Sequence, residues 1–166
     1  MTAKLEAMAH EHSARLLHQI DRMPETGDMV GTASPAELRA RLDETHAFLT
    51  ETLIPHMEAA ERALYPELER MFQNVHSMAP LRREHGVIRR STAELARIRE
   101  HLGEGRISVG QSIALRRVIF HLYALLKVHL AEEQLYLDIL DRREAPEMAE
   151  ALAAAMAHPG SPEAKL

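Results

Sequence analysis

Helical periodicity of apolar residues is the feature that most restricts the fold of this chain. Between residues 115 and 140, apolar side chains recur every three or four positions, which is the spacing of one face of an α-helix. Three other segments show the same pattern, and Ala, Leu, Glu, Arg and Met dominate without β-branched runs. The sequence therefore predicts an all-α protein, and its 166 residues suffice for one domain with one core.

Prolines, glycines and N-cap residues divide the chain into four long helices and one short one. We expect helices over about residues 4–23, 35–74, 78–102, 108–143 and 146–158. Long helices joined by short connections favour an antiparallel up-down four-helix bundle with the short helix appended at the C-terminal side. The bundle is expected to span residues 1–158, and residues 159–166 a flexible tail.

Three prolines carry specific expectations about the helices. Pro24 is expected to end the first helix, and a loop containing Gly27 and Gly31 is expected to follow it. Pro55 and Pro66 lie inside the second helix, where each removes a backbone hydrogen bond. We expect both to kink that helix rather than break it.

Composition excludes several classes of function. The chain has no cysteine, so disulfides, thiolate nucleophiles and iron–sulfur clusters are excluded. A net charge of −5 argues against nucleic acid as the main partner. The most apolar stretch, residues 118–130, is interrupted by His121, Lys127 and His129 and is too short to span a membrane. With no signal segment visible, we expect a cytoplasmic protein without a membrane partner.

Histidine is unusually frequent, and its placement predicts a metal site. The chain has 11 histidines, and one lies on the apolar face of each long helix: His12, His56, His85 and His129. Glu133, four residues after His129, also lies on that face, where leucine would be expected. A buried carboxylate beside buried imidazoles is costly unless something satisfies both, and a cation does so. Imidazole and carboxylate ligands suit iron, manganese or zinc.

These residues also form an ordered pattern along the chain. Its four parts are Glu11-His12, Leu53-Ile54-Pro55-His56 followed by Glu61-Arg62-Ala63-Leu64-Tyr65-Pro66, Glu84-His85, and His129-Leu130-Ala131-Glu132-Glu133. From about Ala9 to Leu140 the arrangement resembles the hemerythrin-like (HHE cation-binding) family. The resemblance implies an up-down four-helix bundle that holds a non-haem di-iron centre. It also implies that the four core histidines and Glu133 are ligands.

One position departs from the family pattern. The family places glutamate four residues after the second histidine, but this chain has Ala60 there. Glu61 lies about 140° around a regular helix from His56. A kink near Pro55 or a local π-bulge would rotate Glu61 inward, which makes it a sixth candidate ligand. Depending on this position, the site holds a pair of ions, a single ion or none.

Several neighbours of the candidate ligands have open roles. We expect His46 and His121 to be partly exposed rather than supplementary ligands, and Tyr65 and Tyr136 to pack in the core rather than act at the site. Glu84 either accepts a hydrogen bond from a ligand imidazole or lies on a solvated face, and Glu11 has the same two options. Arg89, one turn after His85, would repel a second cation if it reached the site.

The sequence thus favours a non-haem iron protein, with two iron ions or one, that binds or reacts with O2, peroxide or NO. Whether it is an enzyme stays open. Two alternatives remain: a helical bundle with a degraded metal site that acts as a regulatory or interaction module, and a mononuclear zinc-binding bundle. We expect a monomer or weak homodimer, since the short last helix would either cap the bundle or pair with a second copy.

Overall fold

The computed structural model describes residues 13–102 and 107–142, with side chains up to residue 139. Within those ranges every regular element is helical, which confirms the all-α prediction for the described part of the chain. Residues 13–21 are helical and precede the first labelled helix. The helices are α2 (Met23–Met29), α3 (Pro35–Ala47), α4 (Ile54–Ala59), α5 (Tyr65–Met71), α6 (Ala79–Glu100) and α7 (Val109–Arg142), with π-helical segments η1 (Phe48–Leu53) and η2 (Ala60–Leu64).

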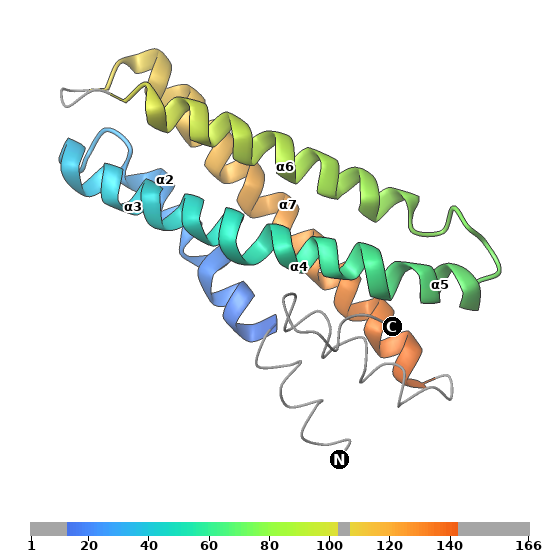
Figure 1. Ribbon diagram of the computed structural model, residues 1–166. Coiled ribbons are helices and arrows are strands. Elements are labelled where there is room, and N and C mark those ends of the chain that lie inside the picture. Colours follow the sequence, from blue (N-terminus) through green and yellow to red (C-terminus); the bar gives the residue numbers. More distant parts are fainter. Residues whose placement is uncertain (1–12, 103–106, 143–166) are drawn as a thin grey trace.

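The helices from α3 to α5 follow one another as a single long rod (Figure 1). Helix α6 runs beside this rod, and α7 crosses behind the rod and α6. Contacts join α6 to α7, α2 to α7 and α3 to α6, so the long helices share one core. The start of the expected first helix and the expected helix over 146–158 lie outside the described residues.

The first helix ends at residue 21, close to Pro24 as expected, but the loop expected to follow it was wrong. Pro24 lies in the first turn of α2, where its missing N–H has no cost because the first N–H groups of a helix lack intrahelical acceptors. Gly27 is buried within this short helix, and a Cβ atom there would lie 2.8 Å from the ring of Phe120. The glycine thus allows α2 to pack closely on α7. The chain turns after α2, at Gly31, whose φ is +88°.

The long second helix continues through both internal prolines, as expected, and each proline lies two residues after the end of a π-helical segment. Ile54 donates its N–H to the carbonyl of Leu49, and Tyr65 donates to Ala60, so both bonds span five residues. In a regular α-helix the ring of proline clashes with the carbonyl four residues earlier, and a wider turn relieves this clash. Each π segment therefore adds about one residue to its turn. The side chains that follow it are rotated by about 100° around the helix axis.

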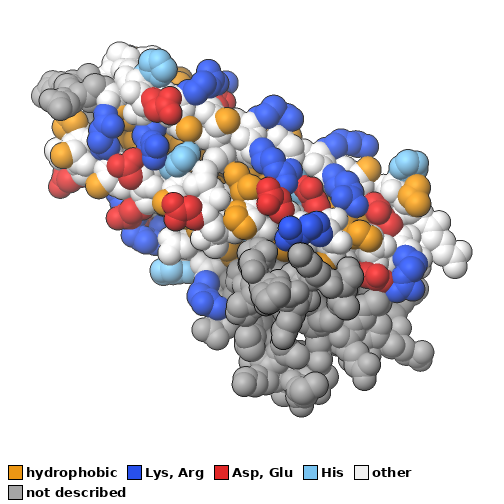
Figure 2. All heavy atoms as spheres, viewed as in Figure 1, with side chains coloured by type: hydrophobic (Ala, Val, Ile, Leu, Met, Phe, Trp, Pro, Cys, Tyr) orange, Lys and Arg blue, Asp and Glu red, His pale blue; other side chains and the backbone are white. Residues whose placement is uncertain are grey.

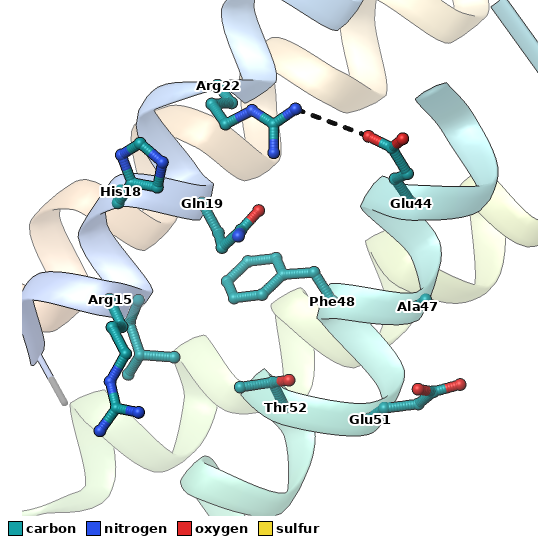
Figure 3. Close-up of a pocket in the computed structure, with 10 residues that line it drawn as sticks. Arg15, His18, Gln19, Arg22, Glu44, Ala47, Phe48, Glu51 and Thr52 are labelled. Carbon is teal, nitrogen blue, oxygen red and sulfur yellow. Dashed lines mark ion pairs between the residues drawn. The ribbon is translucent and has the colours of Figure 1, made fainter. Parts of the chain in front are cut away.

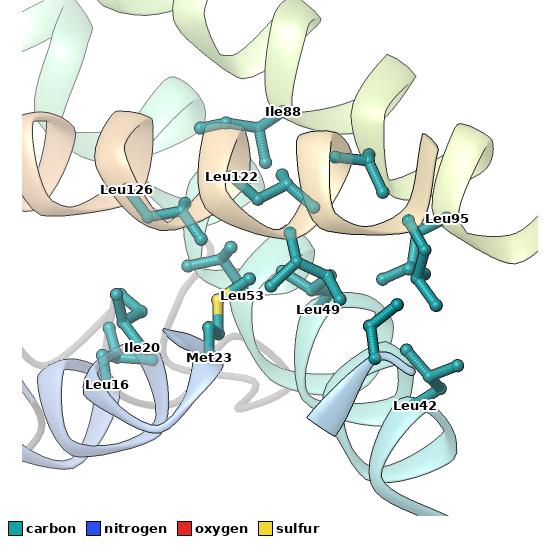
Figure 4. Packing of buried hydrophobic residues seen from close by; sticks show 14 of the residues in the cluster. Leu16, Ile20, Met23, Leu42, Leu49, Leu53, Ile88, Leu95, Leu122 and Leu126 are labelled. Atoms are coloured by element: carbon teal, nitrogen blue, oxygen red, sulfur yellow. The ribbon is translucent and has the colours of Figure 1, made fainter. Parts of the chain in front are cut away.

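Two clusters of buried apolar side chains form the core. The larger one joins residues of the first helix, the rod, α6 and α7, including Leu16, Ile20, Met23, Leu42, Leu49, Leu53, Ile88, Leu95, Leu122 and Leu126 (Figure 4). The smaller one gathers around α5 and the start of α6. On α6, Leu81 belongs to the smaller cluster and Ile88 to the larger one, and the buried His85 lies between them. Polar side chains therefore occupy the junction of the two apolar clusters.

Charged side chains of both signs are interspersed on the face of the molecule that Figure 2 shows. Ion pairs at the protein surface include Arg41–Glu25 and Lys127–Asp21, with N–O distances of 3.0 and 2.9 Å. None of the helices in the described ranges has the length and apolar character needed to cross a membrane.

Candidate metal centre

Three buried side chains from two helices bring metal-ligand atoms together. His85 extends from α6, and His129 and Glu133 extend from α7, one turn apart. Their exposed fractions are 0%, 0% and 2%. The Nε2 atoms of His85 and His129 lie 2.9 Å apart, and Oε1 of Glu133 lies 3.5 Å from the second and 3.9 Å from the first. We call these atoms the three-donor group, and they could hold a metal ion.

The separations within the three-donor group fit a single ion. Nitrogen and oxygen ligands bind first-row metals at about 2.0–2.2 Å, so two ligands of one ion lie roughly 3.0–3.6 Å apart for angles between 90° and 120°. The observed separations bracket this range. Small side-chain rotations are therefore enough to bring all three atoms onto one ion.

Two carboxylates fix the orientation of the imidazole rings from behind. Nδ1 of His85 lies 2.6 Å from Oε1 of Glu61, and Nδ1 of His129 lies 2.8 Å from Oε2 of Glu84. A carboxylate only accepts hydrogen bonds, so both Nδ1 atoms carry the proton. In the neutral rings the Nε2 atoms then present lone pairs to each other, an arrangement that requires a cation between them.

In the metal-free protein a proton serves as that cation. Burial and the neighbouring His129 lower the pKa of His85 to about 4. Burial alone would lower the pKa of His129 as well, but its hydrogen bonds to Glu133 and Glu84 outweigh burial and raise it. The histidine pair therefore takes up one proton readily and resists a second one. Metal binding would displace this proton.

Glu133 makes contacts with several of the buried polar side chains at this site. Its Oε2 accepts a hydrogen bond from Nε2 of His56 at 3.0 Å, and its Oε1 accepts one from the Tyr65 hydroxyl at 2.8 Å. Burial would raise the pKa of Glu133, but hydrogen bonds from His129 and His56 outweigh it, so the pKa lies well below its usual range. Glu133 is thus a buried carboxylate anion whose two oxygens face different histidines.

The segment η2 explains why Tyr65 and His56 reach the same carboxylate. Nine residues of regular α-helix would place their side chains about 180° apart. The additional residue in η2 reduces this angle to roughly 80°. Tyr65, which is fully buried, therefore lies at the site, with its oxygen also 3.0 Å from Nε2 of His85. The expectation that Tyr65 only packs in the core was wrong, and regular helical spacing could not reveal its role.

The other candidate residues fall into distinct places. His12 lies outside the described residues, and His56 is 4% exposed and bound to Glu133. Glu61 does turn inward, but it contacts the outer nitrogen of His85. Burial would raise the pKa of Glu61, but hydrogen bonds from His85 and Arg89 outweigh it and lower the pKa. Because Arg89 lies 3.1 Å from Glu61, the carboxylate offsets its charge.

The remaining candidates lie away from the three-donor group. His46 is half-buried and His121 is exposed, as expected for both. Tyr136 packs against Phe72 with ring centroids 6.2 Å apart, which agrees with the packing role expected of it. Ala60, at the position where the family pattern has glutamate, is fully buried in the smaller apolar cluster.

A cavity of about 510 Å³ lies elsewhere in the molecule, between the helix at residues 13–21 and α3 with η1 (Figure 3). Arg15, His18 and Arg22 line one side of it. Glu44 and Glu51 line the other side, and Arg22 bridges to Glu44 at 3.6 Å. Its described lining contains no residue of the three-donor group.

Comparisons of the chain with protein-family models, with curated proteins and with solved structures found no match. The function of the chain is therefore inferred from the geometry of the site.

Proposed function

We propose that this chain is a hemerythrin-like four-helix bundle whose core holds non-haem iron and which binds or reacts with O2, peroxide or NO. The coarser part of this statement, a buried His/Glu group able to hold a metal ion, describes the observed geometry. The identity of the metal as iron, the binding of a small ligand and the complete four-helix bundle are what we propose.

The observation that carries the proposal is the facing pair of Nε2 atoms, 2.9 Å apart, with a carboxylate behind each ring. Metal-binding histidines in general donate their second nitrogen to a carboxylate or carbonyl, which fixes the tautomer and increases the basicity of the ligand. Here both histidines do so. In a core that serves only for packing, two buried imidazoles whose lone pairs face each other would destabilise the fold.

Two histidines and one carboxylate favour iron as the resident metal. This ligand set with open positions is typical of non-haem Fe(II) sites that handle oxygen species. Bound iron supplies the redox chemistry and the open coordination position. The chain's own residues supply a water-poor site, since all three candidate ligands are at most 2% exposed, and the Tyr65 hydroxyl holds Glu133 by a hydrogen bond.

Glu133 leaves room for a second ion. Its Oε1 belongs to the three-donor group and its Oε2 faces Nε2 of His56 at 3.0 Å. A second ion at His56 would share Glu133 with the first one, and His12, which lies outside the described residues, is a further candidate ligand from the sequence. Because Ala60 supplies no carboxylate, this second position has fewer ligands and is expected to bind more weakly.

The test is the metal content of the purified protein, measured by elemental analysis before any metal is added and again after anaerobic loading with Fe(II). We expect about one or two iron ions per chain. His85→Ala and Glu133→Gln should each lose tight binding, whereas the exposed His121→Ala should retain it. Absence of iron after loading would contradict the proposal and leave the interaction module as the alternative.

Zinc is the second candidate because the same three ligands also form mononuclear zinc sites. The measurement separates the two metals directly. About one zinc ion per chain that Fe(II) does not displace would favour the zinc-binding bundle.

A further inference from the structure

We propose that Tyr65 is the fourth protein ligand of the metal, and that it binds ferric iron through its phenolate oxygen. This inference rests on the proposed iron centre and adds a donor atom to it. The ligand pattern of the family resemblance assigns no role to a tyrosine, and the assignment comes from the positions of the side chains.

The first argument is distance. The Tyr65 oxygen lies 2.8 Å from Oε1 of Glu133 and 3.0 Å from Nε2 of His85. These separations match those within the three-donor group, which range from 2.9 to 3.9 Å. The oxygen is therefore as close to the donor atoms of Glu133 and His85 as the three donor atoms are to each other. An ion bound by the three-donor group would have this oxygen beside it.

The second argument is burial and backbone design. Tyr65 is fully buried, and its ring stacks near His85 with centroids 5.4 Å apart. Only the additional residue in η2 turns its side chain toward Glu133. π-bulges occur frequently at functional sites, where they redirect a side chain. A tyrosine needed only for packing could occupy a regular helical position.

The third argument is charge. Around the three-donor group, Glu61 and Arg89 offset each other, while Glu84 and Glu133 contribute two negative charges. A ferric ion would leave one positive charge in the buried site, and a phenolate at Tyr65 would neutralise it. Burial and the nearby carboxylate of Glu133 raise the pKa of Tyr65, so the phenolate would form only with the ion bound.

The chemistry of binding is a ligand substitution. The phenol would lose its proton to solvent, and its oxygen would take the place of a water molecule that the entering ion carries. Without metal the hydroxyl keeps its proton and donates a hydrogen bond to Glu133. The carboxylate is then released from this hydrogen bond when the ion arrives. No electron transfer is needed for the step.

The test uses the visible spectrum of the ferric protein, prepared by loading Fe(II) under anaerobic conditions and oxidising with ferricyanide. Ligation by Tyr65 predicts a phenolate-to-iron charge-transfer band that Tyr65→Phe abolishes. The other two tyrosines give matched controls, and Tyr123→Phe and Tyr136→Phe should keep the band. Iron content is measured in every sample, so that a missing band is not confused with missing metal.

Resonance Raman spectra of the native ferric protein provide a readout that needs no variant. Excitation within the band should enhance the ring vibrations of a bound phenolate. Iron-loaded native protein without the band, or Tyr65→Phe that retains it, would overturn the inference while the proposed function stands. A native protein that binds no iron would overturn the proposed function itself.

Discussion

Glu84 is adjacent to His85 in the sequence, but its carboxylate binds the other histidine of the three-donor group, His129, across the interface between α6 and α7. The Nδ1–Oε2 distance is 2.8 Å, and His85 is bound in the same way by Glu61 from η2. Each ligand histidine is thus oriented by a carboxylate from a different helix. The two rings are held by three helical elements rather than by the geometry of one.

Removal of Glu84 should weaken metal binding without removing a ligand. We expect Glu84→Ala to lower metal affinity by about 10–100-fold, because His129 loses the acceptor that fixes its tautomer. Glu84→Gln keeps an acceptor and should lose less. Competition with a chelator measures both. Glu58→Gln, on the exposed side of α4, is the control and should bind as the native protein does. Equal affinity of Glu84→Ala and the control would contradict this role.

Glu133 should contribute strongly to the stability of the metal-free protein. Glu133→Ala leaves the buried Tyr65 and His56 without their shared acceptor, and loss of one partner in a buried charged network costs about 3–5 kcal/mol. Urea denaturation in the presence of a chelator measures the free energy of unfolding. Glu132→Ala, at the partly exposed neighbouring position, should change it by less than about 0.5 kcal/mol. Similar values for the two variants would show that the network does not stabilise the fold.

Stability of the metal-free protein should fall as the pH is lowered from 6.5 toward about 4. Burial and the neighbouring His129 lower the pKa of His85 from 6.5 to about 4 in the native state. In this window the unfolded chain binds a proton at residue 85 that the native state does not bind, so the free energy of unfolding decreases by up to about 1.4 kcal/mol per pH unit.

The contribution of His129 to the pH dependence of stability has the opposite sign. Because its pKa is raised in the native state, it stabilises that state at low pH, and this stabilisation is lost as the pH rises through the native pKa. Urea denaturation of the native protein and of His85→Asn across this window isolates the contribution of His85. The variant should show a shallower pH dependence. Parallel curves would argue against the lowered pKa.

Deletion of Ala63, the half-buried residue within η2, should turn Tyr65 away from Glu133. The segment would then close into a regular α-helix, and the Tyr65 side chain would rotate by about 100° relative to His56. We expect the helical content in far-UV circular dichroism to be retained and the stability to fall by about 1–3 kcal/mol, because the buried partners of Tyr65 lose their hydrogen bond. Deletion of the exposed Val75, in the turn before α6, is the control. A deletion of Ala63 that is no less stable than this control would show that η2 does not serve to position Tyr65.

Much of the architecture follows from the sequence because apolar periodicity reports burial directly. The pattern predicted the long helices and placed His56, His85, His129 and Glu133 in the core, where the structure has them. These predictions needed only the rotation of about 100° per residue in a regular α-helix and the energetic cost of burying polar groups.

The failures arise where one turn departs from that regular spacing. Packing in the core was favoured for Tyr65 over a role at the site, and regular helical spacing, which places it opposite His56, gave no reason to expect otherwise. The inward turn of Glu61 was foreseen as a consequence of a π-bulge, but not its contact with the outer nitrogen of His85. At Pro24 the error was different, since a proline at a helix start and one at a helix end look the same in a single sequence.

The burial of His85 and His129 also determines when the metal can enter. Both ligands have no exposed surface, and α6 and α7 pack together around them. An ion would reach their Nε2 atoms through local openings of the packing around them, which the folded protein undergoes during loading. Exchange of a bound ion is then as slow as those openings. The metal found in the protein would reflect which ion was available when the chain folded, rather than which ion binds most tightly at equilibrium.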